Sequence, residues 1–134
     1  MRGALVCALA ALSALAARAA NPHRITPLAD AGVVVSRSPR PQTTYCYTPG
    51  ICRLASGRLV VTCDWGGPDV EKSGEPHGHV YLSDDGGRTW RESRGFPFWH
   101  ARPFEAGGRL YVLGHAGRLR VVRSDDGGET WGEP

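Results

Sequence analysis

The chain has 134 residues, 41% of them hydrophobic and 22% charged, and its formal net charge is +3. By the usual scale this length is enough for one small domain. The sequence gives no argument for nucleic-acid binding, because it contains no basic stripe and no aromatic residues interleaved with basic ones.

Residues 1–19 have the pattern of a secretory signal peptide. Arg2 precedes an apolar segment, residues 4–17, and Ala17-Arg18-Ala19 provides a cleavage site of small residues. The apolar segment is too short to cross a bilayer comfortably. We therefore predict a secreted or periplasmic product, residues 20–134, with no membrane contact after cleavage. Without Arg2 and Arg18, the sixteen basic residues fall to fourteen against thirteen acidic ones. The alternative is an uncleaved membrane anchor.

Three cysteines follow this segment: Cys46, Cys52 and Cys63. An odd number in an exported protein allows at most one bridge within the chain and leaves one free thiol. Cys52 and Cys63 are predicted on neighbouring strands of one hairpin, where they could be diagonal neighbours, but the register leaves the disulfide open. The spacings do not resemble a zinc site, and we expect no metal ion or cofactor.

The chain then alternates between short strand candidates and turns. Apolar alternation and β-branched residues predict strands, and Gly, Pro and Asp clusters predict the turns between them. The candidates are Gly32–Ser36, Gly50–Leu54, Arg58–Asp64, His77–Leu82, a strand starting at Thr89, Arg102–Glu105, Arg109–Leu113 and Leu119–Arg123. In the third of these, Leu59, Val61, Cys63 and Trp65 alternate onto one face.

One eight-residue motif occurs twice, as Ser83–Trp90 and again 41 residues later as Ser124–Trp131. Ser and Asp side chains can bind the N–H groups of the turn that follows them, and paired glycines supply the positive φ of the reversal. Thr and Trp then restart a strand. The structural positions are Ser83, Asp85, Gly87, Thr89, Trp90, Ser124, Asp126, Gly128, Thr130 and Trp131. The period is typical of propeller blades or solenoid repeats.

This motif is the Asp box, S-x-D-x-G-x-T-W, and with it the chain resembles the sialidase (neuraminidase) and BNR-repeat family of β-propellers. The resemblance implies an all-β fold of four-stranded antiparallel blades, two of an expected six. Blade one covers about residues 45–95, and an incomplete blade two covers 96–134. Gly32–Ser36 is then the strand that a propeller lends to its last blade. Two blades leave an open sheet edge, so we expect an N-terminal fragment of a longer protein whose remaining blades are missing.

Blade one carries ten extra residues compared with blade two. Gly57-Arg58-Leu59 and Gly108-Arg109-Leu110 are the same turn exit, 51 residues apart, whereas the Asp boxes are 41 apart. The extra residues lie in the polar segment 66–76, predicted as a loop on the face away from the Asp boxes. In the resembled family that face carries the active site, and long loops are where function concentrates.

The resemblance also implies catalytic roles. Sialidases use three arginines that hold the substrate carboxylate, a Tyr nucleophile polarised by a Glu, and an Asp as acid/base. The acid/base position corresponds to Asp69 or Asp64, and Asp69 is preferred because it lies in the extended loop; a solvated loop carboxylate is the alternative for either one. No residue here is assigned as nucleophile.

Other residues are candidates for substrate contact. The first arginine motif corresponds to Tyr47-Thr48-Pro49, so that Thr48 stands where the family has arginine. His100 and Arg102 occupy the equivalent place in blade two and could face the central pocket. Trp65 and Trp99 could stack on a sugar ring or simply pack. His77 and His79 alternate, so they could share a strand face and chelate a metal, although an ordinary strand pair is the alternative.

Two functions of different classes remain after these arguments. The first is a secreted sialidase-like glycoside hydrolase of exo-α-sialidase type that acts on glycans, with sialylated glycans among the candidates. The alternative is a non-catalytic Asp-box propeller that binds glycan or protein through the same face. The altered arginine motif favours the alternative, and the extended loop of blade one favours the enzyme. A two-blade protein that assembles into a ring is a third hypothesis.

Overall fold

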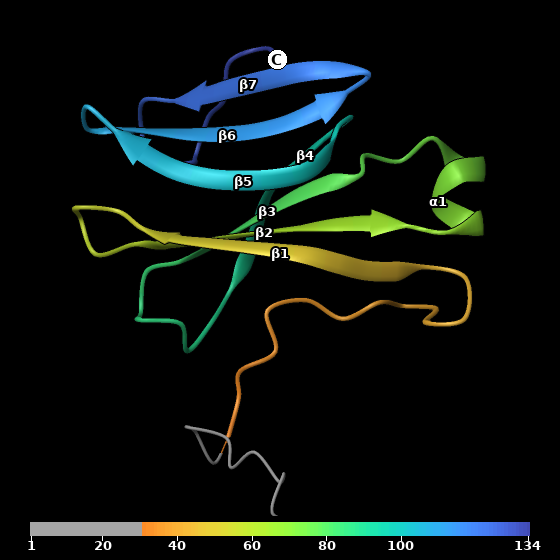
Figure 1. The fold of residues 1–134 in the computed structure, drawn as a ribbon. Coiled ribbons are helices and arrows are strands. Elements are labelled where there is room, and N and C mark those ends of the chain that lie inside the picture. Colours follow the sequence, from red (N-terminus) through yellow and green to blue (C-terminus); the bar gives the residue numbers. More distant parts are fainter. Residues whose placement is uncertain (1–30) are drawn as a thin grey trace, which may run out of the picture. The chain divides into compact units, whose positions relative to one another are not determined.

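Figure 1 shows the fold in a computed structural model, which describes residues 31–134. The predicted signal peptide lies outside the described residues. In chain order, the described elements are β1 (Tyr45–Arg53), β2 (Leu59–Gly66), α1 (Pro68–Ser73), β3 (Gly78–Ser83), β4 (Arg91–Phe96), β5 (Trp99–Ala106), β6 (Arg109–Ala116) and β7 (Arg118–Ser124). None of the helices described is both long and apolar enough to span a membrane.

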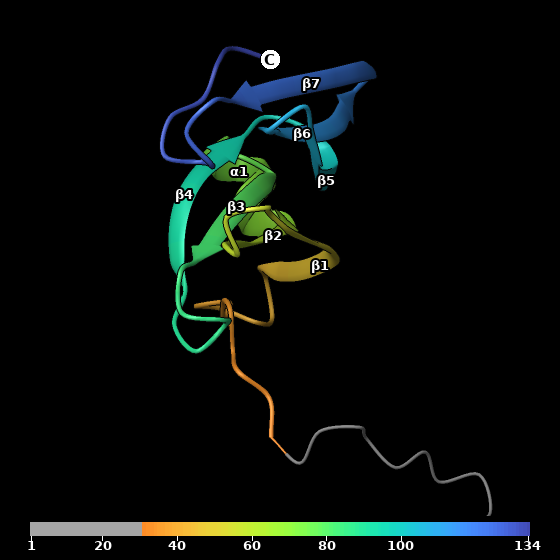
Figure 2. The same ribbon diagram turned by 90° about the vertical axis from the view of Figure 1, so that its left-hand side faces the viewer.

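The strands form two antiparallel sheets that follow each other in the chain. The first sheet has the order β1-β2-β3-β4 and the second the order β5-β6-β7, and each strand pairs with its neighbour in sequence. The two sheets are separate layers that face each other in Figures 1 and 2. The predicted all-β fold with antiparallel, blade-like sheets is therefore confirmed.

The inner strands β1 and β5 begin earlier than predicted. Gly50 and Arg102 were the expected first residues, but the ladders continue to Tyr45 and Trp99. In each strand the register shifts once, between Tyr47 and Gly50 and between Trp99 and Arg102. A β-bulge of this kind interrupts the alternation of side chains, so the apolar pattern breaks although the strand continues.

The strand predicted at Gly32–Ser36 is wrong. Residues 31–44 contain no strand, and Val33 and Val34 are 57% and 58% exposed. A strand forms only where a neighbour completes its hydrogen bonds, and this segment is held by side chains instead. Ser36 Oγ donates to Tyr81 Oη at 3.0 Å, and Val35 packs against the outer face of the first sheet.

The main core lies between the two sheets. Val60, Val80, Leu82 and Phe96 of the first sheet pack against Phe98, Ala101, Leu110, Val112 and Val122 of the second and its entry. The opposite face of the first sheet buries Val61, Cys63 and Tyr81. Strand β2 is therefore buried on both faces, as expected of a strand between two layers.

The connections gather at two ends of the sheets. The two motif turns and the turns at 54–58 and 106–109 lie at one end, which we call the Asp-box end. The segment between β2 and β3 lies at the other, which we call the α1 end (right in Figure 1). The segment predicted as a loop contains α1: Pro68 stands in its first turn, and Val70, only 1% exposed, anchors it.

Candidate functional site

The two Asp boxes at the Asp-box end have the same hydrogen-bond pattern. Asp85 Oδ1 accepts from Ser83 Oγ at 2.8 Å and from Thr89 N at 2.9 Å, and Asp126 repeats both contacts. The Thr89 hydroxyl and backbone N–H hold the pKa of Asp85 well below its usual range, and Thr130 does the same for Asp126. These carboxylates therefore stabilise their own turns.

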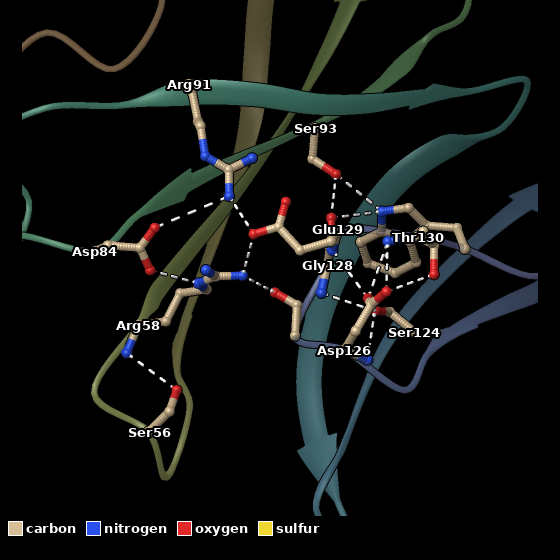
Figure 3. Close-up of polar contacts among 12 residues, drawn as sticks. Ser56, Arg58, Asp84, Arg91, Ser93, Ser124, Asp126, Gly128, Glu129 and Thr130 are labelled. Carbon is tan, nitrogen blue, oxygen red and sulfur yellow. Dashed lines mark hydrogen bonds and ion pairs between the residues drawn. The ribbon is translucent and has the colours of Figure 1, made fainter.

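A hollow of about 620 Å³ also opens at the Asp-box end. Arg58 lines it and joins the sheets, with Nε at 2.6 Å from Asp84 Oδ1 and NH1 at 2.8 Å from Glu129 Oε1 (Figure 3). The same NH1 donates to the Gly127 carbonyl at 2.9 Å. The charges in this hollow satisfy one another, and we interpret it as a joint between sheets rather than a ligand site.

Two non-glycine residues at the α1 end have a strained backbone, and none of those described at the Asp-box end does. Thr48 and His100 adopt φ angles of 50° and 57°. Both lie within the bulges of the inner strands, each directly after an aromatic residue, Tyr47 or Trp99. Such conformations cost of order 1–3 kcal/mol each and cluster at functional sites. The sequence indicated the equivalence of these positions but not their conformation.

Asp64 ties the two bulges together. Its side chain is fully buried at the end of β2. Oδ2 accepts from the Thr48 hydroxyl and from His100 N at 2.7 Å, and Oδ1 accepts from Ala101 N at 3.3 Å. One carboxylate therefore holds the backbone of the second sheet and a side chain of the first.

His115 occupies the place in the second sheet that Asp64 has in the first. Tyr47 pairs with Asp64, and Trp99 pairs with His115. His115 Nε2 lies 2.9 Å from His100 Nδ1, so one ring nitrogen donates a hydrogen bond to the other. Each bulge residue is thus bound by the second strand of its own sheet. The prediction of His100 as a contact residue did not include this partner, because the pairing depends on register.

Aromatic rings and an arginine surround the bulges. Trp99 stacks on His77, with ring centroids 3.7 Å apart, and on Tyr47 at 6.1 Å. Partial burial and the charge of Asp64 raise the pKa of Tyr47, so its hydroxyl stays protonated at neutral pH. Arg102 is exposed, and its NH1 donates to the Thr48 carbonyl at 2.7 Å. This end can therefore offer stacking surfaces and hydrogen-bond donors.

Asp69 lies apart from this cluster, on α1. Its Oδ2 accepts from Arg40 Nε at 2.6 Å and from Thr43 Oγ1 at 2.8 Å. The Thr43 hydroxyl and the Arg40 guanidinium lower the pKa of Asp69, which keeps it ionised at neutral pH. The structure therefore separates the two predicted carboxylates: Asp64 is enclosed beside the bulges, and Asp69 is partly exposed. Their catalytic roles stay predictions.

His77 and His79 do not share a strand face as predicted, and Trp65 packs, which was one of the two roles considered for it. His77 stacks on Trp99, whereas His79 Nδ1 lies 2.7 Å from Glu92 Oε1. Trp65 packs on the outer face of the first sheet and contacts the His79 ring, with centroids 5.0 Å apart. Among residues 31–134 no three His, Cys, Asp or Glu side chains are grouped to hold a metal ion.

No family model and no curated protein sequence matches the chain. Among solved structures it is similar to an α-L-arabinofuranosidase from Fusarium graminearum, in complex with an iminosugar inhibitor. The likeness recurs in a mutant of that protein with such an inhibitor. Each match has a TM-score of 0.53 and 21% identity, and it covers 69% of this chain but 30% of the other.

The chain thus spans less than a third of the length of the structures it resembles. The likeness is one of fold, and it agrees with the two antiparallel sheets described above. It supports a glycosidase-like propeller architecture in general. It does not support the sialidase and BNR family in particular, which the Asp boxes indicated. The chain therefore has the antiparallel sheets of a β-propeller fold, similar to the fold of a glycoside hydrolase.

Proposed function

We propose that the α1 end binds a glycan, and that the chain belongs to a secreted or periplasmic glycoside hydrolase of exo-α-sialidase type. The observation that carries the proposal is the clustering of Tyr47, Trp99, His100 and Arg102 around two strained bulges. Sugars are bound by aromatic faces together with a few oriented polar groups. This end provides both.

Each residue in the proposed site has a physical role. The Arg102 guanidinium suits a sugar carboxylate or a pair of hydroxyls, because its planar N–H groups bind two oxygens at once. The protonated Tyr47 hydroxyl can donate to a sugar oxygen. Asp64 is a positioning residue: it fixes the backbone on which His100 sits. Asp69 remains the proposed acid/base, brought to the substrate from α1.

A non-catalytic glycan- or protein-binding propeller is the second candidate. Thr48 stands where sialidases have an arginine, and all three contacts of Asp64 go to the protein. Both features fit a site that holds a ligand without reacting. Hydrolysis of a glycan by the protein would separate the candidates, and loss of that hydrolysis in Asp69→Ala would favour the enzyme.

Glycan binding by this chain is the direct test. We would titrate it with sialyllactose, with an arabino-oligosaccharide and with lactose, following backbone amide shifts by NMR. We expect shifts at the α1 end with sialyllactose, and about tenfold weaker binding in Arg102→Ala.

Arg53→Ala is the matched control, because Arg53 is an exposed arginine at the Asp-box end of β1. It should bind like the unmodified chain. Binding that is equal in both variants, or shifts confined to the Asp-box end, would contradict the proposed site.

A further inference from the structure

The β1 bulge determines which cysteine side chains lie on the same face of the first sheet and could form a disulfide. Cys46 and Cys52 are six residues apart and would share a face of a regular strand. The bulge adds one residue between them, so Cys46 pairs with Trp65 while Cys52 pairs with Val60. Directly paired residues point to the same side of a sheet. Cys46 and Cys52 therefore point to opposite faces.

Burial on the two faces agrees with this register. Cys52 packs against the core between the sheets, whereas Cys63 belongs to the cluster on the outer face. The disulfide left open between Cys52 and Cys63 is excluded, because the two side chains lie on opposite sides of one sheet. Cys46 lies on the same face as Cys63 and diagonally across the ladder from it.

The two thiols on the outer face are chemically unequal. Cys46 is exposed, and Cys63 is 5% exposed. Hydrogen bonding from the Cys63 thiol lowers the pKa of Cys46 to about 7, and the same contact, together with burial, raises the pKa of Cys63. An accessible thiolate beside a buried thiol is the arrangement of an attacking and a resolving cysteine.

We propose that Cys46 and Cys63 form a reversible disulfide that locks the start of β1 onto β2. With oxidised glutathione as the oxidant, the Cys46 thiolate attacks one glutathione sulfur, and the other glutathione leaves as a thiolate. Cys63 then gives its proton to a thiolate or to solvent and attacks the Cys46 sulfur, which releases the second glutathione. Two cysteine thiols are oxidised, and one glutathione disulfide is reduced to two thiols.

The position of this bond connects it with the α1 end. Tyr47 and Thr48 follow Cys46 directly, and Asp64 follows Cys63. The disulfide would therefore fix both partners of the Thr48–Asp64 hydrogen bond from the neighbouring residues. Oxidation stabilises the bulge that carries the proposed binding site, although the bond itself does not depend on what that site binds.

Peptide mapping tests the bond. The reduced chain is treated with oxidised glutathione, denatured, alkylated with iodoacetamide and digested with trypsin. We expect the peptide that contains Cys63 to be linked to the one that contains Cys46, with Cys52 alkylated. The linked species should weigh about 2 Da less than the same two peptides with Cys46 and Cys63 as thiols and Cys52 alkylated. Oxidation should also raise Tm by roughly 5 °C or more.

Two variants make the result unambiguous, because cleavage after Arg53 leaves Cys46 and Cys52 in one peptide. Cys52→Ser should keep the link and the rise in Tm. Cys46→Ser, at an exposed position, should lose both. Alkylation of Cys46 and Cys63 after oxidation, glutathione retained on Cys46, or a link that persists in Cys46→Ser would each overturn the proposal.

Discussion

Asp64 is a single carboxylate on which two sheets depend. It is enclosed, and three donors from two strands other than its own point at it: the Thr48 hydroxyl and two backbone N–H groups of β5. A buried N–H that loses its acceptor costs about 1–3 kcal/mol. The strained φ angles of Thr48 and His100 therefore persist because Asp64 compensates them.

Replacing Asp64 tests this dependence. We expect Asp64→Ala to lower the free energy of unfolding by about 3–5 kcal/mol, because it leaves buried donors without an acceptor. Urea denaturation followed by circular dichroism would measure the change. Asp69→Ala, which removes a carboxylate that is partly exposed on α1, is the control and should change stability little. Equal effects of the two variants would contradict the role of Asp64.

At the scale of the elements, the positions of most strands could be predicted from the sequence, but details of their pairing could not. Seven strands of the described region were predicted near their observed positions, because turn glycines and apolar alternation are local signals. The bulges of β1 and β5 were not predicted, since a bulge is defined by the strand opposite. His100 could be proposed because it lies at the place in blade two that is equivalent to Tyr47-Thr48-Pro49, but its partner His115 could not, since that contact also depends on the strand opposite. The helix α1 was not predicted, because it is short and polar and Val70 is its one buried residue.

Gly114 in β6 permits the close approach of the chain that enters β5. A Cβ at this position would lie 2.2 Å from Cδ2 of Phe98 and 2.8 Å from the Trp99 carbonyl oxygen. Phe98 is fully buried, so its ring has no space to move. A single methyl group here therefore forces the two sheets to shift at the α1 end.

We expect Gly114→Ala to destabilise the chain by about 1–3 kcal/mol, the usual cost of overpacking. Gly32→Ala is the matched control, since a Cβ there meets nothing within 4 Å. Thermal unfolding of both variants would measure the difference. If Gly114→Ala melted like Gly32→Ala, the packing of Phe98 against β6 would not be as tight as described.

At the scale of the whole described region, the two sheets are joined by a different chemistry at each end. An apolar core lies along their whole interface; in addition, Asp64 joins them at the α1 end and charged side chains join them at the Asp-box end (Figure 3). Arg58, whose side chain is 18% exposed, binds Asp84 of its own sheet and Glu129 of the other. Arg91 also binds Glu129. A half-buried, shared ion pair is worth more than an exposed one.

Arg58→Ala should therefore weaken the docking of the sheets by about 1–2 kcal/mol, and the loss should shrink at high salt. Urea unfolding at low and high salt, with Arg53→Ala as the control, would measure it. A double-mutant cycle with Glu129→Gln isolates the contact between the sheets. Additive effects in that cycle would mean that Arg58 and Glu129 do not interact in solution.

The ion pair of Glu129 with Arg58 depends on the residue at one position of the repeated motif. The two motifs differ at one position only, Arg88 in the first and Glu129 in the second. Arg109 and Asp125 of the second sheet, 2.9 Å apart, repeat the pair that Arg58 and Asp84 form in the first. An acidic residue at this position of the motif can bind the arginine of such a pair, as Glu129 binds Arg58. An arginine at the same position would be repelled by that arginine. The residue at this position of the motif thus determines whether the turn can form an ion pair with the arginine of the preceding sheet.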